Sequence, residues 1–222
     1  MGSVFKDNNI DEVIRLLKRQ VKAFNLPWLE SMANTSRDPF TILISCLLSL
    51  RTQDKTTGEA SEKLFALAST PKKMVLLSVG KIQKAIYPVG FYKVKAKTIK
   101  DISATLLERY GGQVPDEIEE LLKLKGVGRK TANLVITRGF NKYGICVDTH
   151  VHRITNRWGY IKTKTPEETE FALRARLPKK YWKEINGLLV AFGQNICKPR
   201  SPLCSRCDLN SYCMKIKVAK SR

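Results

Sequence analysis

The sequence predicts an all-α protein. Three observations favour this class: apolar residues recur at intervals of three and four, strand-like alternation is scarce, and helix-start signals are frequent. The chain has 222 residues, 43% of them hydrophobic, which is enough for a real core in one large domain or two small ones. We expect about nine or ten helices joined by short turns that contain glycine or proline.

Apolar spacing marks the helices of the first half. One face of the first predicted helix carries Val13, Leu17 and Val21. The run FTILISCLLSL, residues 40–50, is too short to span a membrane and predicts a buried helix. The segment YGGQVP, residues 110–115, predicts a turn between two later helices.

Caps mark two further helix starts. Thr70 precedes Pro71, and Thr165 precedes Pro166, so each pair places a capping hydroxyl before a proline at the first helical position. Glu168 follows Thr165 by three residues, which is the spacing of a capping box.

The segment LKLKGVGRKTANLV, residues 122–135, predicts two helices joined by a sharp turn. Gly126 and Gly128 allow positive φ, and Val127 can pack between the helices. In a helix–hairpin–helix, the backbone N–H groups of such a turn bind a DNA phosphate without regard to sequence. An ordinary αα-hairpin accounts for the glycines equally well.

A basic pair follows this turn. Arg129 and Lys130 stand at the expected first turn of a helix, where the macrodipole disfavours positive charge. Partial burial would disfavour that charge further. Such a position suits a lysine that must react as a neutral amine, while Arg129 stays charged and faces phosphate.

Four cysteines close to the end of the chain predict a metal centre. Their spacing is C-x6-C-x2-C-x5-C, and the chain shows no apolar signal peptide, so disulfides are a poor interpretation. The single C-x2-C and the compact loop favour a 4Fe–4S cluster over zinc, which remains the alternative. The ligands would be Cys197, Cys204, Cys207 and Cys213.

The other two cysteines of the chain, and two basic residues in the cysteine-rich loop, have simpler expected roles. Cys46 and Cys146 sit in apolar settings and are expected to be buried thiols. Lys198 and Arg200, in the loop KPRSPL between the first two ligands, could face a phosphate backbone or simply be solvated.

Net charge predicts a polyanionic partner. Lys plus Arg number 40 against 20 Asp plus Glu, so the formal net charge is +20. Nucleic acid is the expected partner, because no segment is long and apolar enough for a membrane. We expect a monomer that does not bind membranes and that is cytoplasmic, associated with the nucleoid if the source is prokaryotic.

Two motifs together carry a family resemblance. LKGVGRKTANLV is followed by ICVDTHVHR, which places Asp148 18 residues after Lys130, and then by the four cysteines. This combination resembles the endonuclease III family of helix–hairpin–helix (HhH-GPD) DNA glycosylase/AP lyases, from VIRLLKRQ to the last cysteine. The resemblance implies two helical domains flanking a DNA-binding cleft. Residues 31–142 would form a six-helix barrel with the hairpin, and residues 1–30 and 143–222 the iron–sulfur domain.

The resemblance also implies roles for single residues. Lys130 matches the family's nucleophile and Asp148 its catalytic aspartate, while Phe91 matches an apolar wedge that fills the stack after a nucleotide is flipped out. As plain chemistry, Phe91 could equally be a core aromatic. The family's glutamine probe has no direct match, because Arg51 stands in its place and Gln53 two positions later.

The implied function is bifunctional base excision repair. The enzyme would excise oxidised pyrimidines from double-stranded DNA and cleave the strand 3′ to the abasic site by β-elimination through a lysine Schiff base. The alternatives are a mismatch- or adenine-specific glycosylase of the same superfamily and a non-catalytic DNA-binding protein with a metal loop.

Two histidines near the predicted aspartate invite a metal interpretation. On a helix, His150 and His152 project about 200° apart, which is a poor arrangement for two ligands of one metal ion. We therefore expect them to form packing or hydrogen-bond contacts.

Overall fold

The computed structural model describes residues 10–24 and 38–222, and every regular element in these ranges is a helix. The all-α prediction is therefore confirmed. The two ranges hold eleven α-helices, more than expected, because several of them are only five or six residues long. None of the described helices is long and apolar enough to cross a membrane.

The chain divides into two compact units. One consists of Trp28–Gly144, and the other combines Met1–Pro27 with Ile145–Arg222. The predicted domain boundary between residues 30 and 31 lies outside the described residues.

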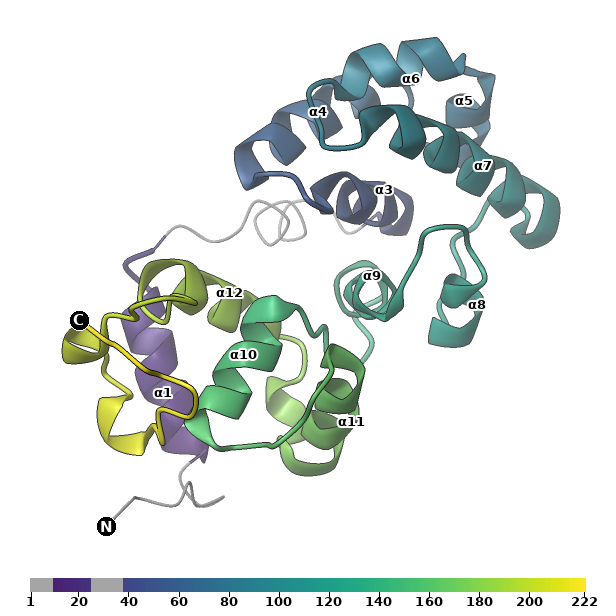
Figure 1. Ribbon diagram of the computed structural model, residues 1–222. Helices are drawn as coiled ribbons and strands as arrows, with labels where there is room; N and C mark the ends of the chain where they lie inside the picture. The colour runs from purple at the N-terminus through teal and green to yellow at the C-terminus, as the bar shows by residue number, and fades with distance from the viewer. Residues whose placement is uncertain (1–9, 25–37) are drawn as a thin grey trace. The chain divides into compact units, whose positions relative to one another are not determined.

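The unit Trp28–Gly144 is built around α3 (Pro39–Ser49) (Figure 1). Nearly the whole circumference of α3 is buried, as its continuous apolar sequence predicts. Burial of each leucine or isoleucine side chain contributes about 1.5 to 3 kcal/mol. Four elements pack directly on α3, namely α4 (Asp54–Leu67), α7 (Tyr92–Tyr110), α9 (Arg129–Leu134) and the π-helical turn η2 (Val135–Gly139). The helix α6 (Val79–Ile86) packs on α4 and α7, α5 (Pro71–Leu76) packs on α7, and α8 (Ile118–Leu122) packs on α9.

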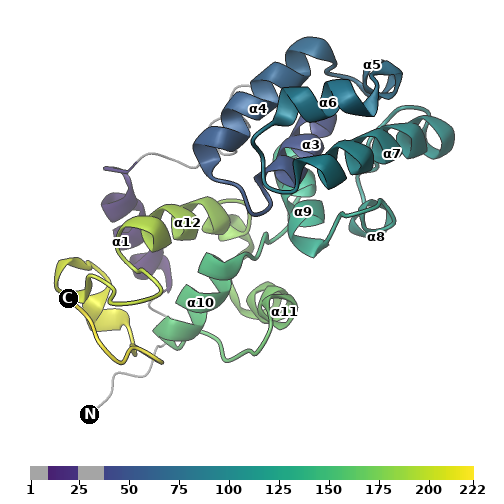
Figure 2. The same ribbon diagram turned by 45° about the horizontal axis from the view of Figure 1, so that its top comes forward.

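The second unit joins the start of the chain to its end. The helix α1 (Ile10–Val21) packs on α12 (Ile185–Asn195), which also packs on α10 (Thr149–Trp158). Figure 2 shows α1 beside α12, close to the yellow C-terminal segment. The other elements of this unit are α11 (Pro166–Arg176), η3 (Lys179–Tyr181), η4 (Cys204–Arg206) and η5 (Asn210–Tyr212).

Polar contacts fasten α1 to the cysteine-rich segment. The Arg19 guanidinium lies 2.8 Å from the Asp208 carboxylate, and the Gln20 amide donates to the carbonyl of Arg206 at 2.6 Å. Because these partners are almost 190 residues apart in the sequence, this unit closes only when both ends of the chain are in place.

The predicted caps form, with one change. Thr70 accepts from the N–H of Lys73 at 3.3 Å, and Thr165 accepts from that of Glu168 at 3.1 Å. The Glu168 carboxylate, however, accepts from the N–H of Lys164 at 2.8 Å, one residue before the cap. The Glu168 side chain thus accepts from the residue before Thr165 and not from Thr165 itself. It still satisfies one backbone donor at the helix start, as a capping box does.

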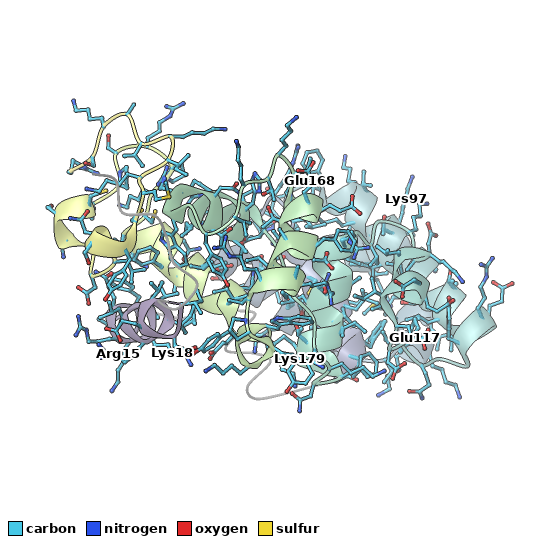
Figure 3. The ribbon with its side chains drawn as sticks, turned by 90° about the horizontal axis from the view of Figure 1, so that it is seen from below. Arg15, Lys18, Lys97, Glu117, Glu168 and Lys179 are labelled. Atoms are coloured by element: carbon cyan, nitrogen blue, oxygen red, sulfur yellow. The ribbon has the colours of Figure 1, made fainter. Side chains whose placement is uncertain are left out.

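Charged side chains cover the surface of both units. Figure 3 shows Arg15 and Lys18 extending from α1, where Lys18 lies 2.7 Å from Glu184 and Arg15 pairs with Glu12. Exposed ion pairs of this kind contribute about 0 to 1 kcal/mol each. Their acidic partners are half as numerous as Lys and Arg, so the surface keeps a large positive excess.

Candidate active site

The predicted turn joins α8 to α9, and the two glycines in it differ. Gly126 has φ of +76°, and a Cβ there would lie 3.3 Å from the Thr98 side chain. Gly128 has φ of −101° and caps α9 in extended backbone, so of these two glycines only Gly126 uses the positive φ that both allow. Val127 is buried, as predicted for a residue between two helices.

The helix α9 presents the basic pair at its first turn. Arg129 is half-buried, whereas Lys130 is exposed, so the expected partial burial of Lys130 is not found. The following residues Thr131, Ala132, Asn133 and Leu134 are all buried. The Asn133 amide donates to the carbonyl of Arg129 at 3.1 Å. The exposed residue Lys130 therefore stands on a helix start whose following residues are packed in the core.

Asp148 is the N-cap of α10. Its Oδ1 accepts from the backbone N–H groups of His150 and Val151, each at 2.9 Å. These bonds fix the carboxylate at the positive end of the helix, and both of them use one oxygen. Asp148 is half-buried, so the side chain is oriented yet still reachable. Lys130 and Asp148 belong to different units.

Both histidines of this helix form hydrogen bonds, as predicted. His150 Nδ1 lies 3.2 Å from the guanidinium of Arg153, and His152 Nδ1 lies 2.7 Å from the hydroxyl of Thr169. Burial lowers the pKa of His152. A Cβ at Gly193 of α12 would lie 2.3 Å from His150 Nδ1, so glycine there lets the imidazole approach the helix.

The wedge candidates sit on two neighbouring turns of one unit. The Phe91 side chain is 62% exposed, which excludes the interpretation as a core aromatic. The Arg51 guanidinium lies 5.7 Å from the centre of its ring. Both residues have left-handed backbone, with φ of 53° at Arg51 and 58° at Phe91, a conformation that costs about 1 to 2 kcal/mol per residue. Gln53 is exposed and stands at the N-cap of α4.

The four predicted ligands line one small pocket. All four line it together with apolar side chains such as Trp158 and Phe192, and none of them is in a disulfide. Cys46 and Cys146 are buried and are not in disulfides either, as predicted. Among the described residues, no three His, Cys, Asp or Glu side chains are grouped closely enough to hold a single metal ion.

The surroundings of these thiols fit a metal cluster. Burial raises the pKa of the Cys207 thiol to about 12, and the neighbouring thiols add to this rise. Burial therefore disfavours the thiolate of Cys207 when no cation is bound, and a bound metal cation would compensate its charge. One zinc ion would need sulfurs at about 2.3 Å from a common centre, whereas a four-iron cluster spreads the same ligands around a larger core.

One residue of this site gave no signal in the sequence. The buried guanidinium of Arg157 in α10 donates to Cys197 Sγ at 3.2 Å and to the carbonyls of Lys198 and Pro199 at 2.9 and 3.2 Å. It thus fixes the loop that carries the half-buried Lys198 and the exposed Arg200. Arg157 looks like any other basic residue on a predicted helix, so only its contacts reveal it.

Comparisons with known proteins agree with this geometry. Residues 44–179 match the model of the HhH-GPD superfamily of base excision DNA repair proteins. Endonuclease III of Thermotoga maritima is 53% identical over 176 residues, which cover 79% of this chain and 83% of that protein. The endonuclease III-like protein 1 of Gallus gallus is 44% identical over 177 residues, or 78% of this chain and 63% of that protein.

Structural comparison gives the same result. A solved structure of endonuclease III in a non-covalent complex with DNA superimposes with a TM-score of 0.83 at 31% identity, over 94% of this chain and 95% of that one.

Proposed function

This chain belongs to the endonuclease III family within the HhH-GPD superfamily of base excision DNA repair proteins, and on that basis we propose which of its residues carry out the family's reaction. Membership makes it a DNA glycosylase with AP lyase activity that acts on damaged double-stranded DNA. A mismatch- or adenine-specific activity and a non-catalytic role are not favoured.

Lys130 is proposed as the nucleophile. The observation that carries this assignment is the position of Lys130, an exposed residue on the first turn of α9 directly after the hairpin turn. The amine nitrogen bonds to C1′ of the damaged nucleotide while the bond from C1′ to the base breaks, and the departing base takes up a proton. The C1′–O4′ bond then breaks and O4′ takes up a proton from water, which leaves a protonated Schiff base on the ring-opened sugar. This Schiff base acidifies C2′, and loss of a C2′ proton expels the 3′ phosphate by β-elimination.

Asp148 is proposed to stabilise the positive charge that develops on the sugar as the base leaves. Its Oδ1 is held by two backbone N–H groups, so the carboxylate needs no reorganisation during the reaction. A preorganised charge of this kind contributes about 10² to 10³ to a rate.

DNA binding is assigned to three groups of residues. The turn residues Gly126, Val127, Gly128 and Arg129 would hold a phosphate, since a Cβ at Gly128 would meet nothing within 4 Å and the backbone there is open to approach. Phe91 would fill the gap left by the flipped nucleotide, and Arg51 or Gln53 would probe the opposite strand.

The four cysteines are proposed to hold a 4Fe–4S cluster, which the family normally carries. When bound, the cluster supplies iron–thiolate bonds that cross-link the loop between Cys197 and Cys213. Lys198 and Arg200 of that loop would face phosphate. Oxidised pyrimidines are the proposed lesions, and the proposed location is the cytoplasm, near the nucleoid if the source is prokaryotic.

Borohydride trapping tests the central assignment. Reduction should join the wild-type protein covalently to a duplex with an abasic site, and Lys130→Gln should abolish both trapping and strand cleavage while keeping DNA affinity. Lys142→Gln is a matched control, because this exposed lysine of the same unit pairs with Asp116. Full trapping by Lys130→Gln would assign the chemistry to another amine.

Defined substrates test the lesion class. Duplexes that each contain one damaged base should show faster single-turnover excision for oxidised pyrimidines than for oxidised or alkylated purines. Equal or faster excision of purines would contradict the proposed substrate.

A further inference from the structure

A lysine that the mechanism does not use is buried beside the wedge turns. Lys95, on the first turn of α7, is only 9% exposed, which is unusual because lysine is almost never fully buried unless it is paired. Its Nζ donates to the carbonyls of Leu48 and Leu50 at 2.9 and 2.6 Å and approaches the Thr52 hydroxyl at 3.3 Å.

These three acceptors match the three donors of an ammonium group. Burial lowers the pKa of Lys95 to about 8, so at pH 7 the ammonium form still predominates. The carbonyls of Leu48 and Leu50 stand at the C-terminus of α3, where the last carbonyls lack partners within the helix and carry negative partial charge. Lys95 therefore completes the end of α3 from a different helix.

The same contacts join the two turns that carry Arg51 and Phe91. The Thr52 hydroxyl also accepts from the N–H of Gly90 at 3.2 Å, and a Cβ at Gly90 would lie 2.5 Å from the carbonyl oxygen of Arg51. The two turns are therefore in direct contact. Lys95 lies on α7, which starts directly after Phe91, and its bonds connect this helix to the turn that contains Arg51.

Backbone strain at the two turns explains why the contacts of Lys95 are needed. Arg51 and Phe91 both hold left-handed backbone, and such strain persists only where the surroundings fix it. Without the three bonds from Lys95, the turn at Arg51 could relax and carry its side chain away from the Phe91 ring.

We propose that Lys95 is a positioning residue, which holds the Arg51 and Phe91 turns together so that both side chains enter the duplex as one preformed wedge. This inference rests on the wedge role proposed above. Preformed geometry matters most when a base pair must be opened, and matters little when the damaged nucleotide is already unpaired.

The test compares two substrates. Single-turnover excision is measured on a lesion paired in a duplex and on the same lesion in a one-nucleotide bulge, which has no opposite base to displace. Lys95→Met should slow excision from the paired duplex at least 10-fold, and from the bulge less than 3-fold. Lys100→Met is the matched control, because Lys100 of the same helix binds only one carbonyl among the described contacts, that of Leu77 at 2.8 Å; it should change both rates less than 2-fold.

Two further variants decide the case if Lys95→Met does not fold. Thr52→Val removes the shared hydroxyl and should lower the ratio of paired to bulged rates, whereas Thr52→Ser, which keeps the hydroxyl, should restore it. Equal slowing on both substrates, or no slowing, in Lys95→Met and Thr52→Val would overturn the inference.

The variant Phe91→Ala distinguishes failure of the positioning role of Lys95 from failure of the proposed wedge role of Phe91. If Phe91→Ala lowers the ratio and the Lys95 and Thr52 variants do not, the wedge stands and the positioning role fails. If Phe91→Ala leaves the ratio unchanged, the wedge assignment itself fails.

Discussion

Replacing Gly90 with alanine should disrupt the junction of the Arg51 and Phe91 turns. The new Cβ would lie 2.5 Å from the Arg51 carbonyl oxygen, which is main chain and cannot swing aside. Ordinary contact begins near 3.4 Å, so one turn must move by roughly 1 Å. Overpacking of this kind costs about 1 to 3 kcal/mol, and loss of the bond from Gly90 to Thr52 adds about 0.5 to 1.5 kcal/mol. We therefore expect a loss of about 1.5 to 4.5 kcal/mol in the free energy of unfolding.

Urea denaturation measures that loss, and single-turnover excision of a paired lesion measures its effect on the reaction. Gly80→Ala provides the control, because a Cβ at Gly80 would meet nothing within 4 Å. Gly80 lies in α6, so alanine should leave stability unchanged or raise it by about 1 kcal/mol. If Gly90→Ala is as stable and as active as the wild type, the two turns are not in the close contact described, and the reasoning is refuted.

Four further outcomes are expected. Protein purified without oxygen should be brown and contain iron and sulfide near four each per chain by elemental analysis, and one zinc without iron would contradict the cluster. Non-specific duplex binding, measured by fluorescence anisotropy, should weaken with salt with a log–log slope of magnitude roughly 4 or more, and a flat slope would mean that the lysines only solvate the surface. Phe91→Gly should keep the free energy of unfolding within about 1 kcal/mol of the wild type, because it relieves left-handed strain at an exposed position; a core residue would cost about 3 to 5 kcal/mol on truncation. Asp148→Ala should cost about 0.5 to 2 kcal/mol as a lost N-cap, whereas Asp148→Asn keeps the cap, and both should slow excision about 10²-fold; undiminished excision by Asp148→Asn would remove the carboxylate from the mechanism.

Local signals in the sequence predicted local structure well. Thr70 and Thr165 cap helices because a hydroxyl and the backbone N–H three residues later are neighbours whatever the rest of the chain does. The run at residues 40–50 predicted a buried helix because its apolar residues leave no polar face for solvent.

Features that depend on distant partners were not predictable in this way. Lys95 stands in the segment YKVKAKTIK, where it resembles its solvated neighbours, and only the end of α3, more than 40 residues earlier, makes it a buried donor. The sequence also did not distinguish the backbone of Gly126 from that of Gly128, because a glycine in a turn can serve either for positive φ or for open approach of another molecule.

The return of the N-terminal helix to the C-terminal half has a consequence for synthesis on the ribosome. The segment α1 leaves the exit tunnel long before its partner α12 exists, an interval of roughly 10 to 35 s at translation rates of 5 to 20 residues per second. During that time the apolar face of α1 has no native surface to cover, while all residues of the unit Trp28–Gly144 are synthesised before α12. The four cysteines emerge later still. We therefore expect that the nascent chain folds the unit Trp28–Gly144 first, and that docking of α1 and folding of the cysteine-rich segment are the closing steps.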